Sequence, residues 1–421
     1  MKFIVSRNKL LSALQHCRCM IGKNAVEMFK DFLFTFGEDG VTMTVVASNG
    51  EEWLTEQVTL DETGKELRTI GFYYSELLRA VKSLEDQPLE FVVGEYQATV
   101  KHSSGSFRLP LSNAAVEFEE FLKSRYSPDD GGKSPYYSIE YEAPGLRSIL
   151  GKCRPYMAQD ELRPALSGVY IDLTSDRASY IASNGHTLIR LCKKPIEQDG
   201  KAVVMSLILP ASAVRNLLKI LPSTGDVVLE YQEALKEERQ EIRKNWAGNG
   251  ETKVYTENVV LRKAVACATI NATVRYSFIP IDGRYPNYNS VIPQHNTYEV
   301  MIGRKQLVKS ISRLLIFAPE SSMMIINATK EQTRLSVEYR DCEMEGEETL
   351  TCECCCSDDK EFEDIRYGVN ARLLASILNT IPTEKVVMKY ENASRACLVL
   401  PVPQSDVEEV TAIIMPIHIN D

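Results

Sequence analysis

The sequence predicts an α+β chain made of three tandem copies of one domain, in which two helices pack against antiparallel sheets. One helix pattern places apolar residues at Phe3, Leu10 and Leu14, then at Ile139, Leu146 and Leu150, and then at Val300, Leu307 and Ile311. A second reads Leu77, Val81 and Leu84, then Val214, Leu218 and Leu221, then Leu374, Leu378 and Ile381. The offsets are 136 and 161 residues for the first pattern, and 137 and 160 for the second. Two independent patterns at nearly equal offsets indicate a triplicated unit.

Strand-like segments and turns repeat with the helices. Residues 41–46, 89–93, 226–230 and 385–389 are rich in β-branched or alternating residues. The turn Ala-Ser-Asn-Gly at 47–50 returns at 182–185, and Asn-Gly favours tight turns between strands. We therefore predict domains at 1–128, 129–295 and 296–421, separated near breaker-rich runs at 127–135 and 293–296. A charged stretch at 232–253 has no counterpart in the first copy, and we expect it to be a solvated, partly helical insertion.

The composition is that of a globular protein with several domains. Its 421 residues are 44% hydrophobic and 25% charged, and no apolar run approaches the roughly 20 residues of a membrane span. Residues 1–5 are interpreted as a first strand rather than a signal peptide, because a charged helix follows at once. We therefore expect a cytoplasmic protein that keeps its thiols reduced.

Eleven cysteines raise the question of disulfides or a metal site. Most are isolated in apolar contexts that are typical of buried thiols, namely Cys17, Cys153, Cys192, Cys267 and Cys397. Four are clustered at positions 352, 354, 355 and 356, and alternation along a strand puts Cys352, Cys354 and Cys356 on one face. Because no second cysteine pair or histidine pair lies nearby, we expect a thiol-rich strand and no metal.

Positive charge is concentrated in the predicted helices, although the net charge of the chain is −10. The windows 6–17, 73–84, 142–154, 210–221, 303–317 and 370–381 hold 14 basic residues and two acidic ones, so they carry +12 and the remainder −22. The basic residues are Arg7, Lys9, Arg79, Lys82, Arg147, Lys152, Arg154, Arg215, Lys219, Arg304, Lys305, Lys309, Arg313 and Arg372. Lys and Arg favour helices on any solvated face, but Glu does so equally and is nearly absent here. The bias predicts a basic surface that contacts the phosphates of a polyanion without reading sequence.

The common catalytic motifs are absent from the sequence. Thr63-Gly64-Lys65 lacks the glycine spacing of a phosphate-binding loop, and there is no G-x-G-x-x-G, H-E-x-x-H or G-x-S-x-G. The five histidines are dispersed without metal-ligand spacing. We expect a non-catalytic protein that needs no cofactor. Two alternatives remain open on these grounds: a repeat scaffold that binds proteins and no DNA, and a DNA-processing enzyme, which the missing metal ligands disfavour.

Four segments resemble one known family. They are Met-Lys-Phe-Ile-Val at 1–5, Ala-Ser-Asn-Gly-His-Thr-Leu at 182–188, Asp-Gly-Arg-Tyr-Pro-Asn-Tyr at 282–288 with Val-Ile-Pro at 291–293, and Ile-Ile-Met-Pro-Ile at 413–417. In order and spacing they resemble the β subunit of bacterial DNA polymerase III, the sliding clamp. The resemblance implies a processivity factor that closes as a head-to-tail homodimer around duplex DNA. It also implies three kinds of protein partner, which are the catalytic subunit of the replicative polymerase, a clamp loader and other proteins with clamp-binding motifs.

The resemblance implies two protein-binding surfaces as well. Partner peptides of a Gln/Leu/Phe type would dock between the second and third domains, in a pocket formed by Ser183, Gly185, His186, Thr187, Leu188, Pro286, Val291, Ile413, Met415, Pro416 and Ile417. An edge strand with Phe107 and Leu109 would meet Ile316 and Phe317 of the neighbouring subunit. The chain departs from well-known members at Thr187, Ser290 and His418, where they carry a basic residue, and by its final Asn420 and Asp421.

Simple geometry favours two chains in such a ring. Helices pack about 8–10 Å apart, so twelve of them give a circumference of roughly 110 Å and a clear diameter of about 25 Å. Six helices would leave under about 10 Å, which is too narrow for a duplex.

Overall fold

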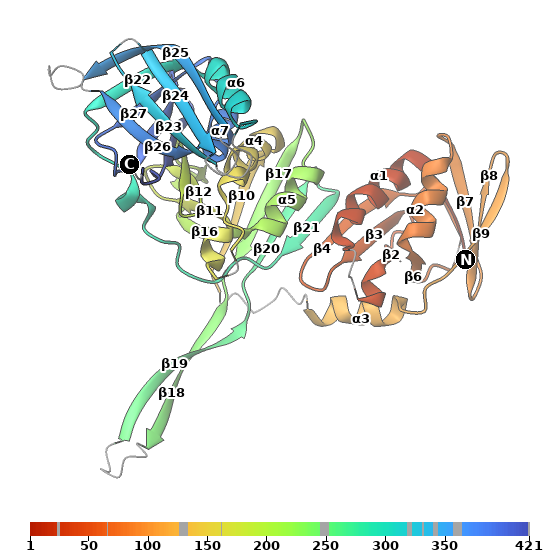
Figure 1. The fold of residues 1–421 in the computed structure, drawn as a ribbon. Coiled ribbons are helices and arrows are strands. Elements are labelled where there is room, and N and C mark those ends of the chain that lie inside the picture. Colours follow the sequence, from red (N-terminus) through yellow and green to blue (C-terminus); the bar gives the residue numbers. More distant parts are fainter. Residues whose placement is uncertain are drawn as a thin grey trace. The chain divides into compact units, whose positions relative to one another are not determined.

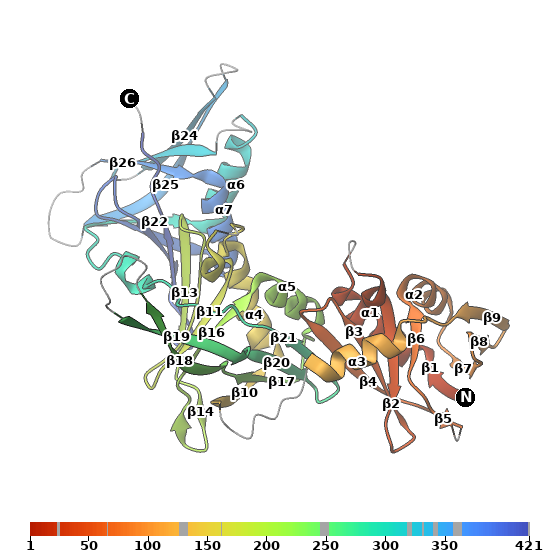
Figure 2. The same ribbon diagram turned by 90° about the horizontal axis from the view of Figure 1, so that it is seen from below.

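The computed structural model describes residues 1–22, 26–64, 66–125, 134–160, 162–244, 252–317, 322–330, 332–339, 344–356 and 364–419. Two compact units are present (Figures 1 and 2). One comprises residues 1–146 and 216–280, and the other residues 147–215 and 281–421. The predicted first domain boundary, at 128/129, falls outside the described residues, and the division into three domains stays a prediction.

The first unit contains two antiparallel sheets. The smaller has the order β5-β1-β7-β8-β9, with β5 (Glu62–Thr63), β1 (Lys2–Ser6), β7 (Pro88–Val93), β8 (Gln97–His102) and β9 (Gly105–Pro110). The larger has the order β10-β17-β20-β21-β4-β3-β2-β6, with β10 (Tyr136–Glu142), β17 (Asp226–Gln232), β20 (Val265–Ile270), β21 (Val274–Phe278), β4 (Trp53–Thr59), β3 (Thr42–Ser48), β2 (Asp31–Phe36) and β6 (Ile70–Tyr73). Because β21 pairs with β4, strands of the first and second repeats share one sheet.

Helices of the first unit follow directly from strands. α1 (Arg7–Cys17) continues from β1 and packs on β3, β4 and α2 (Tyr74–Ser83), with the short turns η1 (Arg18–Met20) and η2 (Glu27–Lys30) behind it. α3 (Ala115–Arg125) was not predicted; its Phe118 is fully buried against Phe29, Leu33 and Val46. The core of the smaller sheet includes Phe3, whose ring stacks on Phe91 at 4.7 Å.

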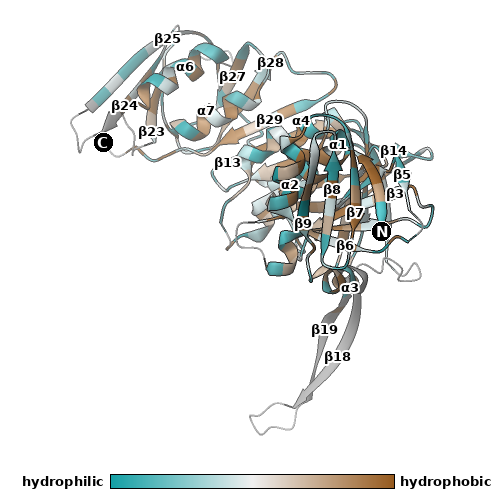
Figure 3. Ribbon diagram, turned by 90° about the vertical axis from the view of Figure 1, so that its right-hand side faces the viewer, coloured by the Kyte–Doolittle hydropathy of each residue, from teal (hydrophilic) through white to brown (hydrophobic). Residues whose placement is uncertain are grey.

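The second unit is organised by one twelve-stranded antiparallel sheet. Its order is β16 (Met205–Pro210), β11 (Gly168–Leu173), β12 (Ala178–Ser183), β13 (Thr187–Lys193), β29 (Glu409–Ile414), β28 (Cys397–Val402), β27 (Lys385–Tyr390), β22 (Tyr298–Gly303), β25 (Met344–Cys356), β24 (Gln332–Tyr339), β23 (Met323–Ala328) and β26 (Ile365–Asn370). The shorter elements are η3 (Arg154–Tyr156), η4 (Pro164–Ser167), η5 (Tyr288–Val291), β14 (Glu197–Gln198) and β15 (Lys201–Ala202). α6 (Arg304–Leu314) and α7 (Ala371–Thr380) pack against each other. Figure 3 shows mainly hydrophobic residues along β29, whose last five residues are buried.

The helix positions confirm the triplication. The first helix of each copy begins at Arg7, Ala143 or Arg304, because α4 (Ala143–Cys153) is the counterpart of α1 and α6. The second helix begins at Tyr74, Ala211 or Ala371, with α5 (Ala211–Ile220) in the middle copy. These starts are separated by 136 and 161 residues, and by 137 and 160, as the apolar patterns predict. The predicted α+β fold class is correct.

The insertion of the second repeat is a β-hairpin and contains no helix in its described part. β18 (Leu235–Lys244) pairs with β19 (Thr252–Arg262), and the two strands run out from the unit as an arm (Figure 1). The predicted partly helical character is therefore wrong for these residues. Arg262 anchors the base of the arm, since its guanidinium donates to Gln232 Oε1 at 2.6 Å and to the carbonyl of Glu233 at 3.1 Å.

Candidate functional sites

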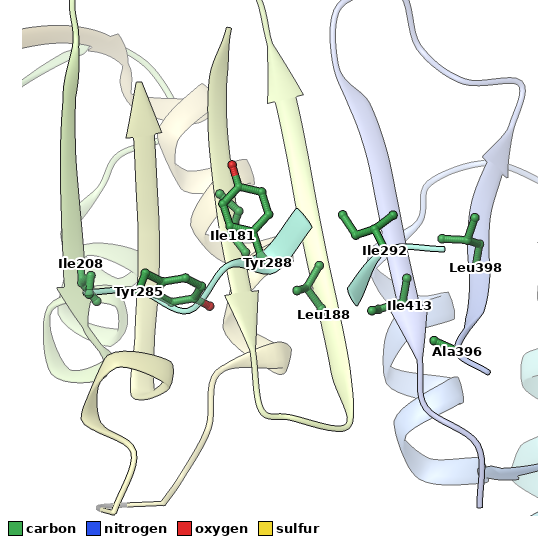
Figure 4. Close-up of a cluster of buried hydrophobic side chains, with 9 residues drawn as sticks. All are labelled: Ile181, Leu188, Ile208, Tyr285, Tyr288, Ile292, Ala396, Leu398 and Ile413. Atoms are coloured by element: carbon green, nitrogen blue, oxygen red, sulfur yellow. The ribbon is translucent and has the colours of Figure 1, made fainter. Parts of the chain in front are cut away.

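A buried apolar cluster forms where strands of the second and third repeats meet. β13 pairs with β29, and Leu188 lies opposite Ile413 in that pairing. Around them gather Ile181, Ile208, Tyr285, Tyr288, Ile292, Ala396 and Leu398, all less than a tenth exposed (Figure 4). Of the residues predicted for the peptide pocket, Leu188 and Ile413 are thus part of this buried cluster, which is the floor of the candidate site. The tyrosines at 285 and 288 were not predicted, although they lie within the quoted Asp-Gly-Arg-Tyr-Pro-Asn-Tyr motif.

The turn between β12 and β13 is held by its own hydrogen bonds. The Ser183 hydroxyl donates to the carbonyl of Thr187 at 2.9 Å, and Asn184 Oδ1 accepts from the backbone N–H groups of His186 and Thr187. Gly185 has a φ of +86°, which favours glycine. Thr187 is buried and its hydroxyl donates to Asn184 Oδ1, so it serves the turn. The exposed His186 presents its carbonyl to the N–H of Met415 at 2.8 Å, which ties the turn to the chain after β29.

The segment 285–292 is fixed on the sheet by its aromatic residues. The ring of Tyr285 stacks on that of Tyr170 at 4.6 Å, and the Tyr288 hydroxyl donates to Asp172 Oδ2 at 2.8 Å. Its neighbours Pro286 and Val291 remain exposed, the latter by 48%, and Met415 is 40% exposed. Exposed apolar side chains therefore adjoin the buried floor, as a surface for an apolar peptide requires.

Pro416 and Ile417 line a separate cavity. It has a volume of about 490 Å³ and lies between the chain end and β26, with Arg366, Gly368, Ala393, Ser394, His418 and Ile419 as its other lining residues. The N–H of Ile417 donates to the carbonyl of Gly368 at 2.8 Å. A Cβ at position 368 would lie 2.5 Å from the Ile417 carbonyl oxygen, so this contact requires glycine.

Two of the basic residues predicted to face DNA connect the helices of their own repeat. Arg7 donates to the carbonyls of Val81 and Lys82 at the end of α2, at 3.1 and 3.0 Å. Arg304, its counterpart in the third repeat, donates to the carbonyl of Leu378 in the last turn of α7 and to that of Thr383 after it, at 3.2 and 2.6 Å. A guanidinium at a helix C-terminus satisfies free carbonyls and complements the helix dipole.

A second equivalent position also has an internal partner in every repeat. His16, Lys152 and Arg313 are the penultimate residues of α1, α4 and α6. His16 Nδ1 lies 2.7 Å from Glu56 Oε2, and this hydrogen bond raises the pKa of His16. Lys152 forms an ion pair with the buried Glu408, which Lys193 also contacts at 3.5 Å. Arg313 makes a two-pronged contact with Glu348, with both N–O distances at 2.5 Å. Lys152 and Arg313 are thus already neutralised within the chain.

The remaining basic residues of the helices are exposed. Lys9 has a weak pair with Asp61 at 3.9 Å, the Arg79 guanidinium donates to the carbonyl of Ser75, and Arg147 and Arg372 have internal partners. Within the described ranges, no ion pair involves Lys82, Arg154, Arg215, Lys219, Lys305 or Lys309. These six are the cations available to an external polyanion.

The open strand edges of the described residues include two at opposite ends of the repeat series. β9 ends its sheet and pairs with β8 alone. In β25, residues 344–351 pair with β24 on one side, while only residues 352–356 pair with β22 on the other. Of the residues predicted at a subunit interface, Phe107 is half-buried, and Ile316 and Phe317 are 70% and 43% exposed. Leu109 is buried in its own sheet.

Tandem repeats, a common set of exposed cations on their helices and open strand edges define a clamp-type repeat protein. A family model described as DNA polymerase III beta subunit, C-terminal domain, matches residues 289–418. Beta sliding clamps of Vibrio cholerae and Haemophilus influenzae are each 23% identical over 422 residues, with complete coverage of both chains. The DNA polymerase III subunit beta of Pseudomonas aeruginosa superposes with a TM-score of 0.80 at 19% identity, and that of Thermotoga maritima with 0.79, again over the full length of both chains.

For this chain, the family model, the curated relatives and the solved structures all indicate the bacterial β sliding clamp, the beta subunit of DNA polymerase III. It is a non-catalytic DNA sliding clamp, a processivity factor, and a scaffold that ignores DNA is not favoured. Among the described residues, no helix is both long and apolar enough to span a bilayer.

Proposed function

We propose that two copies of this chain close head to tail into a ring around duplex DNA, with β9 of each copy added to β25 of the other. The observation that carries this proposal is the way in which the chain pairs its own repeats. A seam is defined here as the strand pair that joins one repeat to the next. The chain contains two such seams. If the same pairing continued beyond the chain, a third seam would use one open strand at each end of the repeat series.

The two internal seams follow one register. In the first, β4 pairs with β21 and Trp53 lies opposite Ser277. In the second, β13 pairs with β29 and Leu188 lies opposite Ile413. Trp53 and Leu188 are equivalent positions, because each is paired across a turn with the serine of the repeated Ala-Ser-Asn-Gly, Ser48 or Ser183.

The same rule specifies the register of the third seam. In the third repeat, Glu345 lies opposite Glu338 in the β24–β25 pairing, and Glu338 takes the position of Ser48 and Ser183. Glu345 therefore corresponds to Trp53 and Leu188. Counting through the first repeat, Arg108 corresponds to Ser277 and Ile413, because it lies opposite Thr99 in the β8–β9 pairing. The seam between copies would then place Arg108 opposite Glu345, and Phe107 opposite Gly346.

The chemistry of both pairs supports this register. Arg108 and Glu345 are exposed and of opposite charge, and such cross-strand pairs are favourable. A Cβ built on Gly346 would meet Leu314 and Phe317 at 3.1 and 3.2 Å, so these side chains already occupy the space above that glycine. Paired residues of antiparallel strands point to the same face. Phe107 would therefore face Phe317, the contact that the family resemblance implies.

Within such a ring, the exposed cations of the helices would face DNA. We assign this role first to Lys82, Arg154, Arg215, Lys219, Lys305 and Lys309, which have no ion-pair partner within the described part of the chain. Lys9, Arg79, Arg147 and Arg372 would add to them. Contacts from scattered lysines to phosphates are independent of sequence and sensitive to salt. A clamp held by topology can slide, because such contacts are individually weak.

We also propose that the cluster around Leu188 and Ile413 receives the short apolar peptides of clamp partners, including the replicative polymerase and a clamp loader. The exposed Val291 and Met415 would contact peptide side chains above this buried floor. Titration of a labelled Gln/Leu/Phe-type peptide tests the assignment by fluorescence anisotropy. Met415→Glu is expected to weaken binding at least tenfold, whereas Val407→Glu, a charge placed on a side chain that is 72% exposed, leaves it unchanged. Equal effects of the two changes would exclude the site.

Linearisation of loaded DNA tests the ring. The protein is loaded onto nicked circular DNA with a bacterial clamp loader and ATP, isolated by gel filtration, and the circle is then cut at one site. We expect the protein to leave the cut DNA and to stay on mock-treated circles. Retention on linear DNA would show binding by direct contact and refute the proposal.

A further inference from the structure

The end of β25 carries an unusual density of thiols. Four of the eleven cysteines of the chain lie between positions 352 and 356. Their exposure alternates as expected for a strand, with Cys352, Cys354 and Cys356 half-buried and Cys355 exposed on the other face. The clamp function makes no use of these residues.

Two of these sulfur atoms are in direct contact. Cys352 Sγ and Cys354 Sγ lie 3.4 Å apart on the same face of β25. Residues two apart on a strand have Cα atoms about 6.4–6.8 Å from each other. That separation is at the upper end of the range of about 4.4–6.8 Å that disulfides bridge. The pair is therefore close enough to join with little movement of the strand.

The surroundings distinguish the two sulfurs. The hydroxyl of Thr333, a residue only 2% exposed, donates to Cys352 Sγ at 3.1 Å. Burial, and then its hydrogen bond with Cys352, raise the pKa of Cys354, so its S–H is retained; either sulfur can donate in their contact. Thr333 thus supplies Cys352 with a buried hydroxyl donor.

We propose that Cys352 and Cys354 form a redox-sensitive dithiol that a peroxide converts to an intrachain disulfide. Cys352 sulfur attacks the peroxide O–O bond, which breaks, and forms a sulfenic acid while one water or alcohol leaves. Cys354 sulfur then attacks Cys352 sulfur; the S–S bond forms, the S–O bond breaks, and the Cys354 proton leaves with the hydroxyl as water. Two thiols are oxidised by two electrons and one peroxide is reduced. A thiol reductant reverses the reaction.

The location gives the pair a place in the clamp. Residues 352–356 pair with β22 and directly follow residues 344–351, the strand edge of the proposed seam between copies. The thiol chemistry itself does not depend on the ring, since both sulfurs and Thr333 belong to one repeat.

Peptide mass spectrometry of the native full-length protein tests the proposal. The reduced protein is treated with a few equivalents of hydrogen peroxide, free thiols are alkylated, and the chain is cut by a Glu-specific protease. Because Glu353 separates Cys352 from Cys354, Cys355 and Cys356, the fragments on either side of it stay joined only if a disulfide links Cys352 to one of these three, and tandem mass spectrometry identifies which. We expect these joined fragments, and their separation after reduction. Complete alkylation of both cysteines under conditions that oxidise Cys355 would overturn the proposal.

Variants separate this mechanism from general thiol oxidation. Cys355→Ser, a change on the opposite face, is expected to keep the bridge. Cys354→Ser should stop the reaction at a Cys352 sulfenic acid that dimedone traps, and Thr333→Val should slow oxidation severalfold while near-ultraviolet circular dichroism shows the fold unchanged. A bridge that forms only in urea, or as readily between Cys355 and Cys356 in the C354S protein, would refute the assignment.

Discussion

Charge reversal across the proposed seam is the most direct test of its register. Arg108 and Glu345 are exposed in the isolated chain, so changing either one disturbs no internal ion pair of the described structure. Arg108→Glu would place two carboxylates opposite each other, and Glu345→Arg two guanidinium groups. We expect each single change to weaken the dimer and the double change to restore it, because the double variant recreates the pair with its charges exchanged.

The size of the effect follows from the symmetry of the ring. A favourable cross-strand ion pair contributes roughly 0.2–1 kcal/mol, and like charges in the same place cost a similar amount. A head-to-tail dimer has two seams, so a single reversal should cost about 1–4 kcal/mol in all. Each 1.4 kcal/mol corresponds to about tenfold in affinity, and the dimer Kd should rise by roughly 5- to 1000-fold.

Sedimentation velocity over a range of protein concentrations measures this Kd. Arg395→Glu is a suitable control, because that side chain is exposed and makes an i,i+4 pair with Glu391 outside the seam. The loss should also diminish at high salt, which screens exposed charges. Additive losses in the R108E/E345R double variant, with no recovery, would refute the register.

Three further predictions concern charged groups inside the chain. Burial raises the pKa of Asp31 to about 6, so the folded state binds an extra proton between pH 4 and 6 and stability falls as pH rises through that window. Asp31→Asn should therefore raise the unfolding free energy at pH 8 by up to about 3 kcal/mol and leave it unchanged at pH 4. An unchanged urea midpoint at pH 8 would contradict this. The pKa of His16 is raised by Glu56, so that pair stabilises fully below pH 6.5 and loses its effect as pH rises past the folded pKa; Glu56→Gln should therefore lower the melting temperature at pH 6 more than at pH 9. Lys152→Met leaves the buried Glu408 with Lys193 alone and should cost about 1–3 kcal/mol in urea unfolding, a loss that Glu408→Gln in the same chain should partly recover.

The regular part of the fold could be predicted because it is encoded locally. Apolar spacing along each helix gave the three copies, and the structure begins α1, α4 and α6 at the predicted offsets. The arm at 235–262 could not be predicted in this way. Its Lys, Glu and Arg favour a helix, but β18 is paired over its whole length with a β-branched strand that includes Val254, Val259 and Val260. Cross-strand pairing has overridden the helix propensity of one segment.

The sorting of charge predicted which helices are basic, and it could not identify the basic residues that have internal partners. Arg7 and Arg304 bind carbonyls more than 70 residues away in sequence, and no local pattern reports such a contact. One signal was present. Both residues occupy the first position of their helix, where a cation is opposed by the dipole of that helix. The unfavourable interaction of each guanidinium with the dipole of its own helix is offset by its hydrogen bonds to carbonyls at the C-terminal end of the neighbouring helix.

The sequence motifs identified part of the candidate peptide site, but they did not identify all the residues that form its surface. Leu188 and Ile413 both lie in the buried cluster, and the resemblance covers the strands that carry them. The floor also needs Tyr285 and Tyr288, whose burial depends on Tyr170 and Asp172 of a distant strand. From sequence alone, a tyrosine in a loop motif is expected to be exposed, because the sheet that buries it is formed by distant residues.

The three seams differ in chemistry in a way that suits a ring that must open. Both internal seams place a large buried apolar side chain, Trp53 or Leu188, at the position that Glu345 takes in the third. An apolar seam forms once, when the chain folds, and is insensitive to salt. The proposed third seam combines an exposed ion pair with a phenylalanine over Gly346, so it buries less and is weakened by salt. Under this proposal, the repeats make two permanent joints within each chain and leave a reversible one between copies, where DNA would enter.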